Sequence, residues 1–416
     1  MSTIHVCGGN TLCGEVDIQG SKNAVLPVMA ASLLIKGKTV LKNCPVITDV
    51  EHMQKLLEAV GCRITKSGRT MEIDASDICA TSFPTEHANV MRSSVVLIGA
   101  LLGRMGEISI CYPGGCVIGK RPIDFHLDIL GQMGVEFSEE NGCIAARAGK
   151  SENRKVMLPF PSVGATENAV LYAAASGCAY QISGCAREPE IIELCEFLNR
   201  SGARIAGAGT SVITIIGVKK LSEICYRIMP DRIVAGTYLL AGAMTRGLVV
   251  LNQAPCDYLS GVFEVLGEMG ADLAIAKDWV CLNGENANRS VRYIKTEVYP
   301  GFPTDMQSMF MAALSISQGC SILEETIFEN RFQVVDELKK MGADIHVIGR
   351  RAMVCGVKKL RGTVVEAKEL RGGAALLLAG LSADGDTYIK NDVFIRRGYE
   401  NIVRDLKLLG AKIEEE

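Results

Sequence analysis

A phrase made of a helix end, a glycine and the start of a strand occurs six times along the 416-residue chain. The six phrases are LLEAVGCRI, LGQMGVEF, FLNRSGARI, LGEMGADL, LKKMGADI and LKLLGAKI. Their glycines are separated by 73, 68, 68, 72 and 68 residues, and they are Gly61, Gly134, Gly202, Gly270, Gly342 and Gly410. Because glycine readily adopts the left-handed conformation that ends a helix, each phrase predicts a helix stop followed by a strand.

Apolar helices of small residues form a second series, out of phase with the first. They end at glycines separated by 69, 71, 70, 72 and 66 residues, which are Gly37, Gly106, Gly177, Gly247, Gly319 and Gly385. Segments such as NAVLPVMAASLLIKG and RGGAALLLAGLSADG carry so few charges that we expect these helices to be buried on most sides. A short β-rich run, such as KTVLKNC, follows each helix.

The two series together define a repeat of about 70 residues that is used six times. Each repeat contains a strand, a buried helix, a strand, an amphipathic helix and a strand pair. The sixth repeat stops at AKIEEE before its last strand, so we expect the N-terminal segments IHVCGGN and GEVDIQG to supply it. The predicted fold class is α/β, with three repeats in residues 21–229 and three in residues 1–20 plus 230–416. A solenoid of six equal units is the competing architecture, but buried helices need sheets on several sides.

Composition excludes several classes of protein. The net charge of −3, from 44 Lys and Arg against 47 Asp and Glu, gives no global case for a nucleic-acid or anionic-membrane partner. Residues 1–20 contain no apolar core of a signal peptide. The longest uncharged stretch, residues 306–323, includes Gln, Ser and Gly, which argues against a membrane span. We therefore expect a soluble, cytoplasmic protein.

The cysteines and histidines predict neither a disulfide scaffold nor a metal site. Sixteen cysteines without a secretory signal are typical of reduced thiols in a reducing compartment. None falls in a CxxC pair, and the five histidines are scattered. Cysteines in apolar runs, such as Cys225 and Cys281, are expected to be small buried hydrophobic residues.

Charged residues recur at matched positions of the repeat. The first turn of a helix favours acids, yet the buried helices begin with cations at Lys22, Arg92, Arg232 and Arg371, and with Asp305 in the fifth repeat. A second matched place, where a strand leads into the amphipathic helix, carries Arg121, Arg187, Arg331 and Arg397. Any single Arg is usually a solvated surface group. Several matched cations beside helix N-termini instead predict a site for a polyanionic small molecule.

One loop stands outside the repeat. Residues 112–122, YPGGCVIGKRP, are rich in Gly and Pro and place Cys116 close to Lys120 and Arg121. Nearby cations favour the reactive thiolate, and a Gly-rich loop suits a lid over a bound ligand. Local features alone leave a plain turn with an incidental cysteine as an equal alternative.

Segments along the whole chain resemble, in order, the landmarks of the UDP-N-acetylglucosamine 1-carboxyvinyltransferase family. They include GSKNAVLPVMAASLL, YPGGCVIGKRPIDFH, PSVGATENAV, FPTDMQSMF, FENRF and ELRGGAALLLAG. The resemblance implies two pseudo-threefold domains of an inside-out α/β type. It also implies transfer of enolpyruvyl from phosphoenolpyruvate to the 3′-hydroxyl of UDP-N-acetylglucosamine, with release of phosphate. This is the first committed step of peptidoglycan precursor synthesis, and it needs no metal or organic cofactor.

The resemblance also assigns roles. Cys116 is the acid for the methylene carbon and can form an adduct with phosphoenolpyruvate, Asp305 accepts the hydroxyl proton, and Lys22 and Arg397 complete the catalytic set. The residues expected around phosphoenolpyruvate are Lys22, Asn23, Arg92, Arg121, Arg331, Arg371 and Arg397. The residues expected to bind UDP-N-acetylglucosamine are Asn23, Arg92, Arg121, Pro122, Ile123, Asp124, Phe125, Ser162, Val163, Gly164, Asp305 and Ile327. The sequence departs from the usual family pattern at Lys120, Phe125, Glu369 and Arg396.

Three alternatives stay open at this point. The same fold could transfer the carboxyvinyl group to 3-phosphoshikimate, although the SKN motif and the cysteine loop speak against that acceptor. A degenerate relative could bind a UDP-sugar as a regulatory protein and release no phosphate. A repeat protein that serves only as an interaction scaffold does not account for the matched cations. Phosphate release measured with 3-phosphoshikimate and with UDP-N-acetylglucosamine distinguishes the first two alternatives.

Overall fold

The structure is a computed structural model that describes residues 2–83, 92–111, 123–140, 143–149 and 154–416. At residues 92, 93, 111 and 140 it describes the backbone alone. The described residues form two units with separate apolar cores. The middle unit contains the described residues between 20 and 229, and the discontinuous unit combines residues 2–19 with Pro230–Glu416.

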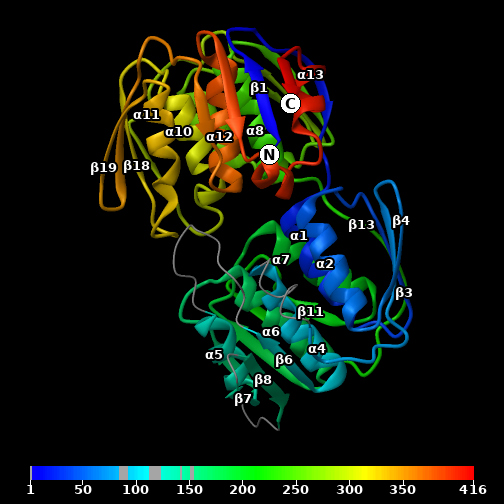
Figure 1. The fold of residues 1–416 in the computed structure, drawn as a ribbon. Helices are drawn as coiled ribbons and strands as arrows, with labels where there is room; N and C mark the ends of the chain where they lie inside the picture. The colour runs from blue at the N-terminus through cyan, green and yellow to red at the C-terminus, as the bar shows by residue number, and fades with distance from the viewer. Residues whose placement is uncertain (1, 84–91, 112–122, 141–142, 150–153) are drawn as a thin grey trace. The chain divides into compact units, whose positions relative to one another are not determined.

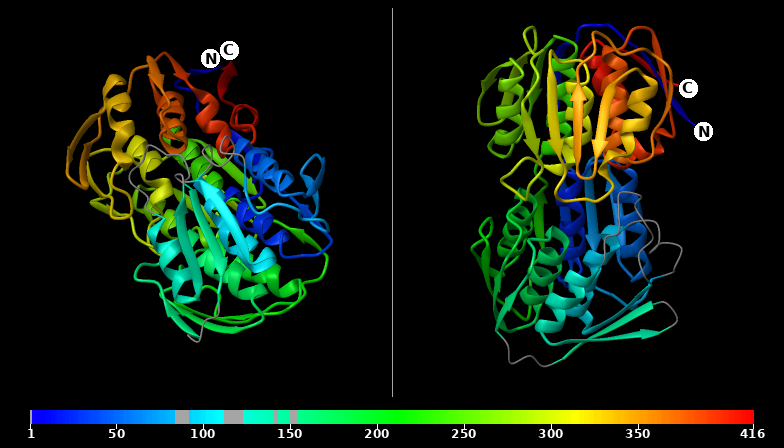
Figure 2. Two further views of the ribbon diagram at one scale, coloured as in Figure 1. Left: turned by 60° about the horizontal axis from the view of Figure 1, so that its bottom comes forward. Right: turned by 90° about the vertical axis from the view of Figure 1, so that its left-hand side faces the viewer.

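In the middle unit, helices of small apolar residues occupy the interior, and the strands lie outside them (Figures 1 and 2). The approach of α4 to α6 requires Gly99, because a Cβ atom there would lie 2.3 Å from the carbonyl oxygen of Asn168. The helices are α1 (Lys22–Ser32), α2 (Thr48–Ala59), η1 (Arg92–Val96), α4 (Leu97–Met105), α5 (Asp124–Gln132), α6 (Val163–Ala175) and α7 (Pro189–Arg200).

The strands of the middle unit form three sheets, ordered β13-β3-β5-β4, β6-β8-β7 and β11-β12-β10-β9. In each sheet, the strand that follows a buried helix pairs antiparallel with the second strand of a hairpin. The strands are β3 (Lys38–Lys42), β4 (Arg63–Ser67), β5 (Thr70–Asp74), β6 (Glu107–Cys111), β7 (Val135–Glu140), β8 (Cys143–Ala148), β9 (Lys155–Met157), β10 (Ala179–Ser183), β11 (Arg204–Ala206), β12 (Val212–Ile216) and β13 (Ile224–Arg227).

The discontinuous unit repeats this plan around the buried helices α8, α10 and α12. Its helices are α8 (Arg232–Met244), η2 (Cys256–Tyr258), α9 (Ser260–Glu268), η3 (Thr304–Met306), α10 (Gln307–Leu314), η4 (Arg331–Val334), α11 (Val335–Lys340), α12 (Leu370–Ser382), η5 (Asp392–Arg397) and α13 (Ile402–Leu408). In the described part of the chain, no helix is both long enough and apolar enough to span a bilayer.

Three four-stranded sheets cover these helices, ordered β15-β16-β14-β2, β17-β18-β20-β19 and β21-β22-β1-β23. Their strands are β1 (Thr3–Cys7), β2 (Cys13–Asp17), β14 (Leu248–Asn252), β15 (Asp272–Ile275), β16 (Trp279–Asn283), β17 (Tyr293–Lys295), β18 (Cys320–Glu324), β19 (Asp344–Ile348), β20 (Arg351–Cys355), β21 (Val364–Glu366), β22 (Asp386–Lys390) and β23 (Lys412–Glu415). The predicted α/β class is confirmed, and the solenoid alternative is wrong because the helices cluster in two groups.

The N-terminal strand β1 completes the sixth repeat, as predicted for IHVCGGN. The expectation that GEVDIQG also completes it is wrong, because β2 pairs with β14 of the fourth repeat. Strand β1 pairs antiparallel with both β22 and β23, so it occupies the position that β5, β12, β16 and β20 hold in their own sheets. Figure 1 shows the blue β1 arrow among the orange and red C-terminal elements. The strand therefore joins the beginning of the chain to its end by backbone hydrogen bonds.

The edge strands β2 and β13 are exchanged between repeats, which the sequence did not predict. The strand before a buried helix usually pairs in parallel within its own repeat, as β9 does with β10 and β17 with β18. By contrast, β2 precedes α1 but pairs with β14, and β13 precedes α8 but pairs with β3. The chain therefore enters the middle unit directly after β2 and leaves it directly after β13.

The predicted helix stops are confirmed in the first glycine series. All six of its glycines have φ between +89° and +108°, the left-handed region that suits residues without a Cβ atom. The second series has one exception. At the end of α8, Arg246 takes the left-handed conformation with φ of 54°, and Gly247 follows it.

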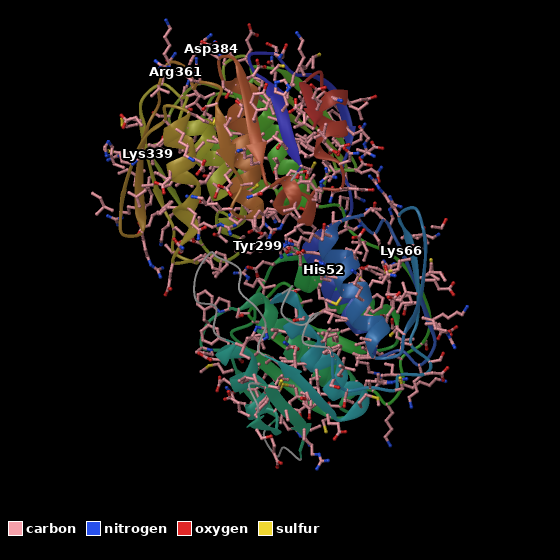
Figure 3. All side chains as sticks on the ribbon, in the orientation of Figure 1. His52, Lys66, Tyr299, Lys339, Arg361 and Asp384 are labelled. Atoms are coloured by element: carbon pink, nitrogen blue, oxygen red, sulfur yellow. A yellow bond between two sulfur atoms is a disulfide. The ribbon has the colours of Figure 1, made fainter. Side chains whose placement is uncertain are left out.

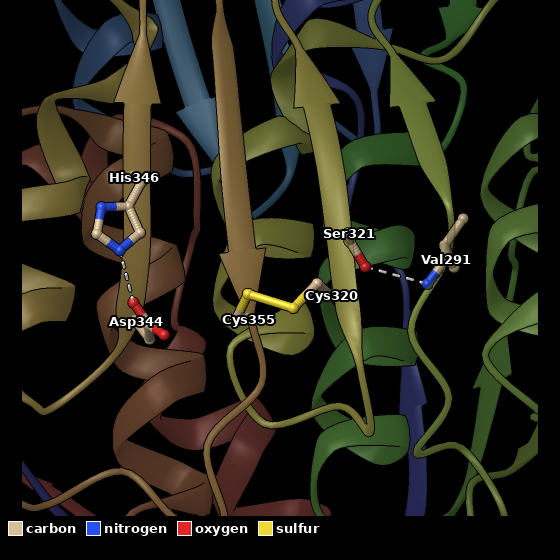
Figure 4. The surroundings of a disulfide bond; sticks show 6 residues. All are labelled: Val291, Cys320, Ser321, Asp344, His346 and Cys355. Atoms are coloured by element: carbon tan, nitrogen blue, oxygen red, sulfur yellow. Dashed lines mark hydrogen bonds and ion pairs between the residues drawn. A yellow bond between two sulfur atoms is a disulfide. The ribbon is translucent and has the colours of Figure 1, made fainter.

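Two expectations about cysteines are wrong. Cys320 and Cys355 form a disulfide bond across β18 and β20, where the register places them opposite each other with Cα atoms 4.1 Å apart (Figure 4). Cys225 is exposed and Cys281 is half-buried, because strand side chains alternate and these two positions fall on the less buried face. An apolar run indicates a strand without showing which of its positions face the core.

A buried carboxyl group holds the end of the middle unit. Glu193 of α7 is 8% exposed, and its side chain accepts a hydrogen bond of 2.9 Å from the backbone N–H of Met229. Burial raises the pKa of Glu193 to about 7. The folded chain therefore retains this proton over a pH range in which the unfolded chain has released it.

We predict that stability falls as pH rises from about 4.5 to 7, because the unfolded state binds fewer protons there. Glu193→Gln removes this loss, so at pH 8 it should raise the free energy of unfolding by about 1–3 kcal/mol. At pH 4 it should give no comparable gain. Urea denaturation at both pH values, with hydrogen exchange of middle-unit amides, measures the change. Glu196→Gln on the exposed side of α7 is the control, and an equal gain for both variants contradicts the prediction.

Candidate functional site

Lys22 is the first residue of α1, a helix that Ser21 caps by accepting a hydrogen bond from the N–H of Ala24. Its Nζ atom lies 2.7 Å from Oδ2 of Asp49, whose side chain is only 1% exposed. Asp49 belongs to the first turn of α2, with His52 one turn further along (Figure 3). The sequence identified Lys22 but missed Asp49, and its only local signal was an acid in the first turn of an amphipathic helix.

Asn168 connects three elements that carry predicted site residues. Its Oδ1 atom accepts a hydrogen bond of 2.6 Å from the N–H of Gly99, and Nδ2 donates to the carbonyl oxygen of Val95 at 3.0 Å. Nδ2 also lies 2.7 Å from Nδ1 of His126 in α5. The fully buried amide therefore ties α6 to the segment that begins at Arg92 and to α5. The sequence contained Asn168 within a motif but did not predict this role.

The predicted nucleotide residues at the start of α6 lie beside α5. Ser162 caps α6, and Val163 and Gly164 form its first turn, where backbone N–H groups have no partner within the helix. A Cβ atom at Gly164 would lie 2.8 Å from Cε1 of His126, so glycine allows α5 to approach this helix end. Such a helix start is suited to contact an anionic group.

At the start of α5, one predicted nucleotide residue is buried and the next two are exposed. Ile123, expected to bind the nucleotide sugar, is buried like a core residue, whereas Asp124 is exposed. Phe125 is 37% exposed and stacks on Phe160, with ring centroids 6.0 Å apart and planes 20° apart. The two rings form an open aromatic surface that the sequence did not predict, because Phe160 lies outside the quoted motifs.

Four predicted residues cannot be placed by side chain. Cys116, Arg121 and Pro122 lie outside the described residues. Arg92 begins η1, and its side chain also lies outside the described set. Asn23 is the second residue of α1 and is half-buried.

In the discontinuous unit, Asp305 bridges two guanidinium groups. Its Oδ1 atom lies 2.7 Å from Nη2 of Arg331, and its Oδ2 atom lies 3.2 Å from Nη2 of Arg371. The side chains of Arg331 and Arg371 are 2% and 5% exposed, whereas that of Asp305 is 28% exposed. Two adjacent cations favour the ionised carboxylate. Three residues predicted from distant motifs therefore form one cluster.

Arg371 keeps its charge inside the protein. Burial by itself lowers the pKa of Arg371, but the charge of Asp305 raises it above the ordinary value. The guanidinium group of Arg331 lies over the ring of Phe328, 5.4 Å from its centroid. Nε of Arg331 is buried and has no hydrogen-bond partner among the described residues. The cluster therefore contains a buried donor that an anion can satisfy.

Glu325 fixes the two segments around Asp305. This buried carboxylate accepts hydrogen bonds of 2.9 Å from the hydroxyl groups of Thr296 and Thr304. It also accepts the backbone N–H groups of Ile327 and Phe328, at 2.8 and 3.0 Å. The turn that carries Asp305 is thereby joined to the segment that carries the predicted nucleotide residue Ile327. The sequence did not identify Glu325, because its partners lie on both sides of β18.

The two family departures in this unit are accommodated locally. Glu369 caps α12, where its carboxylate accepts the N–H of Arg371 at 2.7 Å and that of Gly372. Arg396 contacts Asp392 at 2.8 Å and Glu415 at 2.9 Å. Its neighbour Arg397 ends η5 and is half-buried.

Two other cations at matched repeat positions, Arg232 and Arg187, differ in their burial. Arg232 is buried at the start of α8, with its guanidinium group 5.8 Å from the ring centroid of Tyr299, which is labelled in Figure 3. Arg187 is exposed, and its Nε donates a hydrogen bond to the carbonyl oxygen of Gly209 at 3.3 Å. A matched repeat position therefore does not by itself identify a residue of the anion site.

Comparison with known proteins gives a consistent result. The sequence matches the model of the EPSP synthase (3-phosphoshikimate 1-carboxyvinyltransferase) family over residues 6–406. It is 46% identical over 413 residues to UDP-N-acetylglucosamine 1-carboxyvinyltransferase 2 of Caldanaerobacter subterraneus subsp. tengcongensis, and the alignment covers 99% of both chains. The UDP-N-acetylglucosamine 1-carboxyvinyltransferase of Thermotoga petrophila is 44% identical over 416 residues, with coverage of 100% of this chain and 99% of the relative.

Two solved structures share the fold. The enolpyruvyl transferase NikO from Streptomyces tendae has a TM-score of 0.88 and 24% identity, with coverage of 100% of this chain and 98% of that chain. EPSP synthase from Acinetobacter baumannii has a TM-score of 0.77 and 18% identity, with full coverage of both chains. At these identities the likeness establishes the architecture alone.

We predict that Glu325→Ala lowers the free energy of unfolding by about 2–4 kcal/mol, because it leaves several buried donors without an acceptor. Glu325→Gln should restore part of the loss, since its amide oxygen can still accept hydrogen bonds. Thermal and urea denaturation measure both effects. Glu329→Ala, at an exposed position of the same segment, should change stability by less than about 0.5 kcal/mol. Equal stability of Glu325→Ala and the unmodified chain contradicts the assigned role.

Proposed function

The chain belongs to the EPSP synthase family and, within it, to the UDP-N-acetylglucosamine 1-carboxyvinyltransferases, and we propose that it transfers enolpyruvyl to UDP-N-acetylglucosamine. The observation that carries this conclusion is identity of 44–46% over 413–416 residues with enzymes of that name. The donor is phosphoenolpyruvate, the acceptor atom is the 3′-hydroxyl oxygen, and the second product is inorganic phosphate.

The reaction is an addition followed by an elimination. The hydroxyl oxygen forms a bond to C2 of phosphoenolpyruvate while the methylene carbon gains a proton, which produces a tetrahedral ketal. Loss of a proton from that carbon and departure of phosphate restore the double bond. The protein must therefore supply a base for the hydroxyl group, an acid for the carbon and cations for the carboxylate and phosphate.

The cluster around Asp305 suits two of these requirements. Arg331 and Arg371 are buried cations that can bind the anionic donor, and the Nε group of Arg331 is available to it. Asp305 is partly exposed and ionised, so it can accept a hydroxyl proton once a substrate displaces part of its ion pairing. Arg397 adds a further cation to this proposed set.

The middle unit supplies the remaining proposed residues except Ile327, which belongs to the discontinuous unit. Lys22, Asn23, Arg92 and Arg121 bind the donor, and the last three also contact the acceptor. Cys116 protonates the methylene carbon and can form an adduct with phosphoenolpyruvate. The nucleotide set consists of Pro122, Ile123, Asp124, Phe125, Ser162, Val163, Gly164 and Ile327. The exposed ring of Phe125, extended by Phe160, offers a flat apolar surface to a uracil ring.

The setting follows from this chemistry. We assign the protein to peptidoglycan precursor synthesis, hence to cell wall biogenesis, cell shape and cell division, in the bacterial cytoplasm. Its partners are the two small-molecule substrates, with no nucleic acid, membrane or cofactor involved. Transfer to 3-phosphoshikimate is the second candidate, because the family description names that reaction.

Phosphate release tests the reaction and its acceptor together. We expect release only when phosphoenolpyruvate and UDP-N-acetylglucosamine are both present, and none with 3-phosphoshikimate. Cys116→Ala should abolish release, whereas the exposed Cys225→Ala should retain it. After incubation with fosfomycin, mass spectrometry should find one adduct, on Cys116. Full turnover by Cys116→Ala would overturn its role, and binding of the sugar nucleotide without release would favour a regulatory protein.

Asp305→Asn tests the base. The amide can still accept a hydrogen bond from a guanidinium group but cannot take up a proton, so kcat should fall about 100- to 10,000-fold. Circular dichroism should show a folded chain, and calorimetry should detect retained binding of UDP-N-acetylglucosamine. Asp344→Asn, a surface substitution in β19, is the matched control and should keep full kcat. An unchanged kcat in Asp305→Asn would rule out proton transfer to this residue.

A further inference from the structure

Side chains of metal-ligating types gather on the sheet that joins the two ends of the chain, and none of them is assigned to a substrate. His5 and Cys7 are two residues apart on β1, so their side chains project from the same face. The register places Cys7 opposite Asp386 on β22, and His5 opposite Tyr388 on β22 and Glu414 on β23. Three strands therefore direct ligand types to one face.

The ligand atoms are close enough to share one ion. Nε2 of His5 lies 3.1 Å from Oδ1 of Asp386 and 3.7 Å from Sγ of Cys7. All three atoms lie within 4.8 Å of one another. Zinc bonds to N, O and S ligands in a tetrahedron place the ligand atoms about 3.3–3.7 Å apart. Only small side-chain movements would convert the present contacts into a coordination shell.

The imidazole of His5 is already oriented for this role. Its ring stacks on Tyr388, with centroids 4.7 Å apart and planes 7° apart. The second ring nitrogen, Nδ1, lies 3.3 Å from a carboxylate oxygen of Glu414. A histidine that binds a metal through one nitrogen commonly donates from the other to a carboxylate. The side chain of His5 is 14% exposed and that of Asp386 is 55% exposed, so solvent can reach the ligand atoms.

We propose that His5, Cys7 and Asp386 bind a divalent cation of the zinc class, with water as the fourth ligand. A thiolate and an imidazole favour zinc over magnesium or calcium, which prefer oxygen ligands. On binding, the Cys7 thiol releases its proton to solvent and a sulfur–metal bond forms, with no change of oxidation state. The ion then links β1 to β22 by coordinate bonds, in addition to their backbone hydrogen bonds.

This site goes beyond the proposed transferase reaction and does not depend on it. Only His5 and Cys7 are close in sequence, and 381 positions separate His5 from Asp386, so the three ligands form no zinc motif. The sequence therefore predicted no metal site. Pairing of the terminal strands is what brings the three residues together.

Titration of the full-length protein with Zn²⁺ against a chromogenic chelator, and with Co²⁺ as a spectroscopic probe, tests the proposal. We expect the unmodified chain to bind one equivalent more Zn²⁺ than Cys7→Ser or His5→Ala. With Co²⁺, the unmodified chain should show a sulfur-to-cobalt charge-transfer band, and Cys7→Ser should lack it. Glu414→Gln should weaken zinc affinity about tenfold, because it removes the carboxylate that orients His5.

The control is His346→Ala. His346 forms a comparable pair with Asp344, 3.1 Å apart, on a different sheet (Figure 4). The His346→Ala variant should bind as many equivalents of zinc as the unmodified chain. Phosphate release should be unaffected in both His346→Ala and Cys7→Ser. If His5→Ala fails to fold, the nearly isosteric Cys7→Ser and Glu414→Gln decide the matter. Equal zinc stoichiometry and equal cobalt spectra in Cys7→Ser and the unmodified chain would overturn the site, whatever the outcome of the transferase assay.

Discussion

Each unit depends on the packing of helices built from small apolar residues in its interior. Because these helices are buried on most sides, apolar sheet faces must surround them, and charged groups can reach solvent chiefly at the helix ends. The site residues follow this constraint. Lys22 begins α1, Arg371 lies in the first turn of α12, and Asp305 lies in η3 before α10. The ion pair of Asp305 with Arg371 brings two of these helix starts together.

The charges at these helix starts run against the usual preference for acids. Lys22 and Arg371 add positive charge where the helix dipole is already positive, and each is balanced by a carboxylate, Asp49 or Asp305. Buried ion pairs recover little more than their desolvation cost, so stability does not explain them. The proposed binding of an anion gives these cations a role. The chain's net charge of −3 conceals this local excess of buried cations.

The sequence named three residues that the structure brings together, but it missed the residues that support them. Asp305, Arg331 and Arg371 were predicted from motifs and repeat positions, and the structure brings them into contact. Asn168 and Glu325 were missed, because a positioning residue is defined by partners on other elements. The same limit explains the opposite error, in which Arg187 occupies a matched position but lies exposed on the surface.

The sequence by itself determined six repeats, their buried and amphipathic helices, and the glycines that end them, because these features depend on steric and periodic rules that act over a few residues. Only the tertiary structure decided how the strands pair. The exchange of β2 and β13, the contact of Cys320 with Cys355, and the convergence of His5, Cys7 and Asp386 all require segments far apart in the chain. Backbone hydrogen bonding is the same for nearly every residue, so strand partners are chosen by the packing of the whole unit, which no local pattern records.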